Sequence, residues 1–152
     1  MDEQALRHEI KVAFEYSYLH DDWVTPLEEA LEGVTAEQAL RRPRPNSKGI
    51  WEIVLHLAMW NENIVDRIRT GQPTRATEEH WPPLPPTPDE AAWEAAKKRL
   101  WDSLESMRVA IEAAPMEKIV GMHYGLGDLF CRFNHLAYHG GQIVKLRECF
   151  DF

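Results

Sequence analysis

Apolar residues recur every three or four positions along four long segments of this chain. Three of the segments run from about residue 3 to 19, 50 to 69 and 128 to 149, and the fourth lies between Asp89 and Pro115. This period places the apolar side chains on one face of an α-helix. Alternation typical of strands does not recur over several segments. The sequence therefore predicts an all-α protein built from four long amphipathic helices.

Capping residues, glycines and prolines predict where shorter elements begin and end. We expect Asp21 or Asp22 to cap a short helix over residues 23–32, which Gly33 ends. Residues 41–46 contain two prolines and are predicted to form a loop, because neither proline tolerates a helix around it.

The second and third long helices are separated by residues 73–88, which hold six of the ten prolines. We expect an extended, ordered crossover here, anchored by Trp81 and Leu84, and a helix cap at Thr87 or Asp89. A long connection allows the two helices that it joins to run parallel. The predicted fold is a four-helix bundle of up-down-down-up topology, in a single domain that spans residues 1–152.

Charge and cysteine content narrow the class of protein. The chain has 17 Lys and Arg against 25 Asp and Glu, a net charge of -8 that disfavours binding to nucleic acid. No segment approaches the ~20 apolar residues that span a bilayer, and the N-terminus does not resemble a signal peptide. Cys131 and Cys149 lie about 27 Å apart on one predicted helix, too far to pair. We expect a cytoplasmic protein with reduced thiols.

Two histidines in the last predicted helix stand four residues apart. His135 and His139 therefore lie one turn apart on the same face, where both imidazoles can reach a single ion. The same spacing also occurs in solvated or hydrogen-bonded pairs. The surrounding helix is broadly apolar, however, and buried imidazoles need polar partners. One metal ion would be a partner for both rings.

His56 is the third candidate ligand, in an otherwise apolar run over residues 53–60. A lone histidine in such a run is more often a core residue that hydrogen-bonds a carbonyl or hydroxyl. A single histidine in one central helix and a pair in another are nevertheless what a site between facing helices requires. We predict that His56, His135 and His139 hold one divalent metal, with zinc favoured and nickel as the alternative. Three protein ligands leave a coordination position open, as in catalytic sites.

Four further residues are candidates for the wall of a pocket beside these histidines. Trp51, Trp60 and Asn63 lie on the same predicted helix as His56, and Cys131 lies one turn before His135. Packing alone can also explain them. For Cys131 the core is the favoured position, since a free cysteine behaves as a small apolar residue. The remaining histidines are expected on the surface or in loops: His8, His20, His80 and His123.

Three segments of the chain resemble the DinB superfamily of small bacterial helical bundles. They are residues 23–33, 50–58 and 135–143, and they contain a central-helix histidine and a later H-x-x-x-H followed by G-Q-I. A second glycine, Gly140 beside Gly141, departs from the pattern. The resemblance implies a four-helix up-down-down-up bundle, commonly a homodimer. It also implies a metal triad, which maps onto His56, His135 and His139.

Relatives in this superfamily include bacillithiol and mycothiol S-transferases, which activate a low-molecular-weight thiol. The resemblance thus implies a metal-dependent enzyme with a small thiol as substrate, with S-transfer as the first expectation and hydrolysis as the second. Two other interpretations stay open. The chain could be a non-enzymatic, stress-associated helical dimer with a structural or sensory metal, or a metal-free bundle whose three histidines form a hydrogen-bonded cluster.

Overall fold

The computed structural model describes residues 2–71, 80–121 and 125–152 of the chain. These residues form helices and connecting loops and contain no strand, so the prediction of an all-α protein is confirmed. The helices of the described residues are α1 (Glu3–Tyr16), α2 (Leu27–Leu31), α3 (Ala36–Leu40), α4 (Ile50–Thr70), α5 (Glu90–Ala113), α6 (Met116–Val120) and α7 (Leu126–Phe150). None of them is long and apolar enough to cross a membrane.

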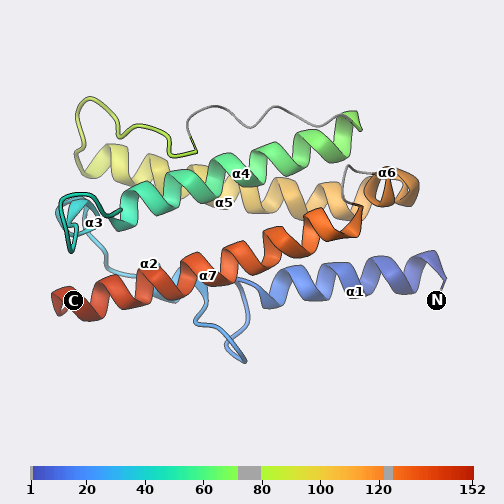
Figure 1. Cartoon of the computed structure of the whole chain (residues 1–152), viewed down its shortest axis with the longest axis horizontal. Helices are drawn as coiled ribbons and strands as arrows, with labels where there is room; N and C mark the ends of the chain where they lie inside the picture. The colour runs from blue at the N-terminus through green and yellow to red at the C-terminus, as the bar shows by residue number, and fades with distance from the viewer. Residues whose placement is uncertain (1, 72–79, 122–124) are drawn as a thin grey trace.

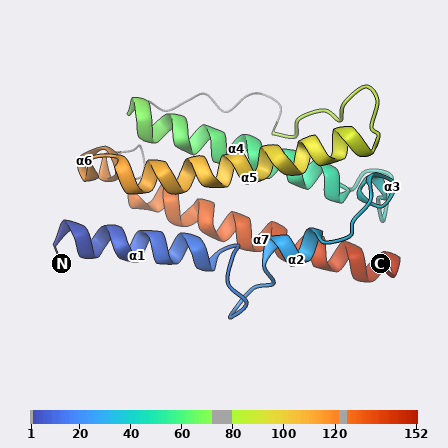
Figure 2. The same ribbon diagram turned by 180° about the vertical axis from the view of Figure 1, so that it is seen from behind.

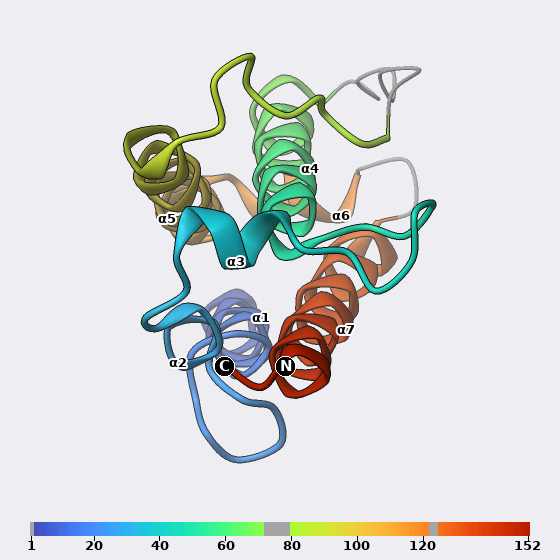
Figure 3. The same ribbon diagram turned by 90° about the vertical axis from the view of Figure 1, so that its left-hand side faces the viewer.

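The four long helices α1, α4, α5 and α7 lie alongside one another around a common core (Figure 1). Helix α4 contacts both α5 and α7, and α1 contacts the same two helices from the other side. Helices α4 and α5 run in one direction, and α1 and α7 run in the opposite direction (Figures 1 and 2). Helix α3 lies at one end of the bundle, near the start of α4, and α2 follows α1 in the same row beside α7 (Figures 2 and 3).

Side-chain caps and one glycine set the ends of the long helices. The Asp2 carboxylate accepts a hydrogen bond of 2.8 Å from the Ala5 amide at the start of α1. Asp89 caps α5 in the same way, as predicted. Helix α4 ends at Gly71, whose φ of 69° lies in the left-handed region that glycine adopts without strain.

The short helices were the least predictable part of the chain. The helix expected over residues 23–32 begins only at Leu27, directly after Pro26, and no aspartate caps it. The prediction of a cap at Asp21 or Asp22 is therefore wrong, because the proline fixes the first turn without a side-chain cap. Helices α3 and α6 were not predicted at all, since five residues are too few to show a helical period.

The predicted crossover lies partly outside the described residues, which resume at His80. Residues 80–89 are not helical. Trp81 and Leu84 are partly buried and pack against the core, in agreement with their predicted role as anchors. The position of Trp81 brings the connection against the middle of the bundle, where the candidate site lies.

The packing of the core predicts that alanine substitutions at two positions of α5 lower the free energy of unfolding by very different amounts. Leu100 is fully buried, whereas Val109 on the same helix is 43% exposed. Leu100→Ala should lower the free energy of unfolding by about 2–5 kcal/mol, because it removes buried methyl groups and leaves a cavity. Val109→Ala should change it by less than about 0.5 kcal/mol. Urea unfolding followed by circular dichroism measures both, and equal losses would contradict this packing.

Candidate metal centre

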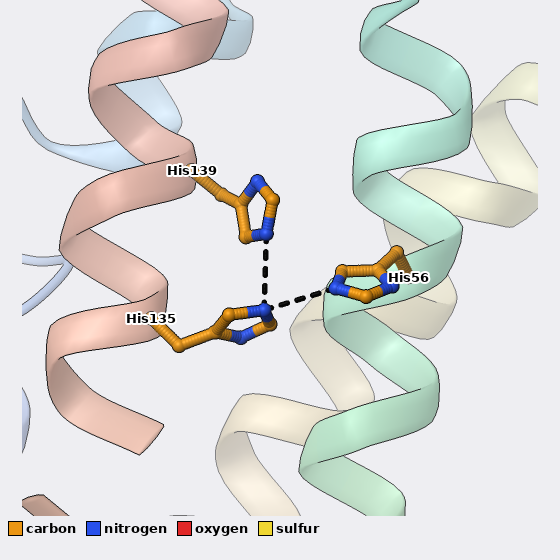
Figure 4. A group of neighbouring side chains, drawn as sticks. All are labelled: His56, His135 and His139. Atoms are coloured by element: carbon orange, nitrogen blue, oxygen red, sulfur yellow. Dashed lines mark hydrogen bonds between the residues drawn. The ribbon is translucent and has the colours of Figure 1, made fainter. Parts of the chain in front are cut away.

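Three imidazoles from two facing helices converge on one point between them (Figure 4). His56 comes from α4, and His135 and His139 come from successive turns of α7. The Nε2 atom of His135 lies 2.9 Å from that of His56 and 3.0 Å from that of His139. His56 and His139 are only 6% and 4% exposed, and His135 is partly buried. The structure thus brings all three predicted ligands together.

The spacing of these nitrogens fits a divalent metal. Two ligands about 2.0–2.1 Å from one tetrahedral zinc ion lie about 3.3 Å apart, close to the separations found here. One nitrogen from each ring can be chosen so that all three lie within 4.8 Å of one another, which is compact enough for a shared ion. Among the described residues, this is the group of histidine, cysteine and carboxylate side chains with that geometry.

Hydrogen bonds at Nδ1 hold two of the rings in the tautomer that can bind a metal through Nε2. His56 Nδ1 donates to the backbone carbonyl of His80, and His139 Nδ1 donates to Gln142 Oε1 at 2.6 Å. Both oxygens can only accept, so the hydrogen of each neutral ring sits on Nδ1 and Nε2 offers its lone pair to the shared centre. Gln142 in turn donates to the Tyr138 hydroxyl at 2.8 Å, which fixes the orientation of its amide.

His135 has a different outer partner. Its Nδ1 lies 2.7 Å from Nη1 of Arg132, and a guanidinium group can only donate. Nδ1 therefore accepts, and the hydrogen of the neutral ring sits on Nε2, where it points at the other two histidines. A metal can use this Nε2 only after the hydrogen leaves it. Arg132 thus opposes metal binding at one of the three ligands.

Burial keeps the three rings uncharged. Together with the nearby Arg132 charge, it lowers the pKa of His135 to about 3 and that of His139 to about 4, from an ordinary value of 6.5. The pKa of His56 is lowered for the same first reason. Burial also lowers the pKa of Arg132 itself, to about 10. At neutral pH the three imidazoles are therefore neutral, which is the state that binds metal.

The structure places the four predicted pocket residues in different surroundings. Trp51 is fully buried and packs against Trp93, with ring centroids 5.2 Å apart, so it belongs to the core. Trp60 is partly buried beside the Arg132 guanidinium, and Asn63 is partly buried on α4. Cys131 is exposed, so its favoured placement in the core is wrong. It lies on the side of α7 that faces away from the other helices.

A cavity of about 740 Å³ adjoins the triad, and residues other than these four line it. His139 and its partner Gln142 lie in its wall, together with Trp81. The Trp81 ring also stacks on the His56 ring, with centroids 4.0 Å apart. Sequence reasoning identified Trp81 only as an anchor, because its contact with His56 depends on the path of the connection before α5.

The depressed pKa values predict how acid affects the metal-free protein. An unfolded chain protonates its histidines near pH 6.5, but the folded chain protonates His139 only near pH 4. The unfolded state therefore binds more protons below pH 6.5, and stability falls as the pH falls from about 6.5 to 4. His139→Gln should reduce this loss by up to about 1.4 kcal/mol per pH unit. Urea unfolding measured across this pH range tests the prediction. His8→Gln, at an exposed position of α1, is the control. Identical pH profiles for the parent and the His139 variant would contradict the prediction.

The contact between Arg132 and His135 predicts a variant that binds metal more tightly. Arg132→Met keeps an apolar stem beside Trp60 and removes the donor, so the His135 hydrogen can move to Nδ1. Zinc affinity should rise by about tenfold, in competition with a chromophoric chelator. Nitrogen-15 spectra of the metal-free imidazoles should show the shift of that hydrogen from Nε2 to Nδ1. Arg99→Met, at an exposed position of α5, is the control. Weaker zinc binding by the Arg132 variant would contradict the assignment.

Comparison with known proteins identifies the family of the chain. A family model described as the DinB superfamily matches residues 23–143, which include all three histidines. Comparisons with curated proteins and with solved structures find no significant match. The matched region runs from the loop before α2 into the second half of α7 and so covers most of the described helices. On this evidence the chain belongs to the DinB superfamily.

Proposed function

We propose that the chain is an enzyme that depends on one divalent metal and transfers a low-molecular-weight thiol to an electrophile. His56, His135 and His139 would be the ligands, with zinc favoured and nickel as the alternative. The observation that carries this proposal is the convergence of three neutral imidazoles, two of them with Nδ1 already hydrogen-bonded to an oxygen. The up-down-down-up bundle expected for the superfamily is part of the same proposal.

Neutral ligands suit this chemistry. A divalent ion with an open coordination position lowers the pKa of a thiol or a water molecule bound there. Three imidazoles add no negative charge, so they do not offset the positive charge of the ion that lowers this pKa. The Arg132 guanidinium adds a further positive charge beside His135, and that charge favours a thiolate over a thiol. Trp81, stacked on His56, covers one side of the triad and keeps water from it.

The proposed transfer needs no additional redox partner. The S–H bond of the thiol breaks and its proton passes to solvent. The sulfur then forms a bond to the electrophilic carbon as the bond between that carbon and its leaving group breaks. Hydrolysis is the second candidate reaction, with water in place of the thiol.

A non-enzymatic role is the alternative, and one feature of the surface favours it. Trp23 is 89% exposed in the loop before α2, and Leu19 in the same loop is 47% exposed. A second copy of the chain could cover these side chains in a homodimer, with a structural or sensory metal in each subunit. A closed coordination sphere that accepts no thiol would favour this alternative.

Metal content tests the proposal directly. Protein purified without a metal-affinity tag should hold about one zinc or nickel per chain, and His56→Ala and His139→Ala should hold little, because each removes one of three ligands. His8→Ala, an exposed histidine on α1, is the matched control and should keep the metal. Circular dichroism establishes that the variants remain helical.

The outcome also separates the candidate functions. A parent protein that stays empty after dialysis against zinc and nickel would contradict the metalloenzyme. Metal-loaded protein that consumes a small thiol only when an electrophile is present supports S-transfer. Metal that is retained without thiol or ester turnover supports the structural or sensory role.

A further inference from the structure

The cavity beside the triad lies between the start of α4 and the second half of α7, and it is closed on one side by Trp81. We propose that it binds the organic part of the substrate, and that this part is an anion with a flat apolar body. The link to a substrate rests on the proposed function, but the binding site itself stands on the residues that form the cavity.

The size and wall of the cavity suit a small organic molecule. Its volume of about 740 Å³ lies within the range of about 300–1,000 Å³ usual for ligand pockets. Ile53, Leu146 and the Trp81 ring provide apolar surface, and the Tyr138 side chain, 62% exposed, stands at the edge. A flat ring can therefore lie against Trp81 and leave a polar group near the opening.

The charges around the cavity favour an anion. Acidic residues outnumber basic ones in this chain, yet the described residues that line the cavity include Lys48 and Lys145 and no carboxylate. Glu52 lies behind this wall and accepts from Lys48 at 2.9 Å, but it also pairs with Arg42 at 3.0 Å. One carboxylate thus faces two cations, and a positive charge remains at the opening. Lys145 adds no net charge to this balance, because it pairs at 2.6 Å with Glu148, which does not line the cavity.

Gly141 keeps the cavity open. A glycine inside a helix costs about 1 kcal/mol relative to alanine, and here no neighbour requires it. A Cβ atom added at Gly141 would meet nothing within 4 Å, whereas one added at Gly140 would lie 3.5 Å from Leu27. Any larger side chain at Gly141 would therefore project into the space that a ligand needs.

Two residues of the cavity wall also contact histidines of the proposed metal centre. Gln142 lines the cavity and accepts the hydrogen bond from His139 Nδ1. Trp81 lines it as well and stacks on His56. A ligand in the cavity thus contacts two residues that each hold a histidine of the triad.

Two cysteines on α7 provide a reporter and its internal control. Both are exposed, but Cys149 lines the cavity and Cys131 does not. The probes are 2-naphthoate, 2-naphthamide and 2-naphthylmethylammonium, which share one ring system and carry charges of about -1, 0 and +1 at neutral pH. At ten times its Kd, naphthoate should slow alkylation of Cys149 by iodoacetamide about tenfold and leave Cys131 unchanged. The amide and the ammonium probe should protect less at the same concentration.

Substitutions in the wall test the origin of the protection. Gly141→Leu should abolish protection by filling the cavity, and it should not harm the helix, since leucine is a better helix former. Lys145→Glu should weaken naphthoate and strengthen the ammonium probe. Lys98→Glu is the matched control, because Lys98 is exposed on α5 and pairs with a carboxylate four residues away, outside the cavity. Circular dichroism shows that each variant is folded, and unchanged alkylation of Cys131 shows that the reagent itself is unaffected.

Three results would overturn the inference. They are the absence of protection by any probe, equal protection by all three probes, and protection that persists in Gly141→Leu. The experiment is run on metal-free and zinc-treated protein, with metal content measured in parallel. Protection by naphthoate in a protein that never binds metal would support the anion site and contradict the proposed function, so the two can fail separately.

Discussion

The arrangement of the molecule depends on the burial of the first half of α4 on all its sides. Every residue from Ile50 to Ala58 is buried, between α5 on one side and α7 on the other. A polar side chain in such a helix costs free energy unless its polar atoms find hydrogen-bond partners. His56 meets this demand with the His80 carbonyl on Nδ1 and with His135 Nε2 on its own Nε2. The candidate site is thus a consequence of how deeply α4 is packed.

The triad balances two opposing effects. Burial makes the imidazoles neutral, and the Nε2 lone pairs of His56 and His139 point to the centre of the triad, which favours a cation there. Arg132 places a cation directly outside His135 and holds its hydrogen on the wrong nitrogen for binding. The cost of turning Arg132 away limits the affinity of the site for metal.

Helix α7 contributes to both the triad and the cavity. His135 and His139, one turn apart, point toward His56 on α4 (Figure 4), and His139 also lines the cavity with Gln142 and Cys149 from the next turns. Spacings of three, four and seven residues place these side chains along one stripe of the helix. The hydrogen bond from His139 to Gln142 therefore joins a histidine of the triad to the cavity wall.

The sequence by itself determined the long helices, the cap of α5 at Asp89 and the three histidines, because periodicity and spacing are local properties. It could not reveal α3 and α6, whose five residues show no period, nor the surface position of Cys131. The contact of Trp81 with His56, the carbonyl of His80 and the cavity were decided only by tertiary structure. They arise where the connection before α5 folds back on α4, and no local pattern encodes a contact between side chains so far apart along the chain.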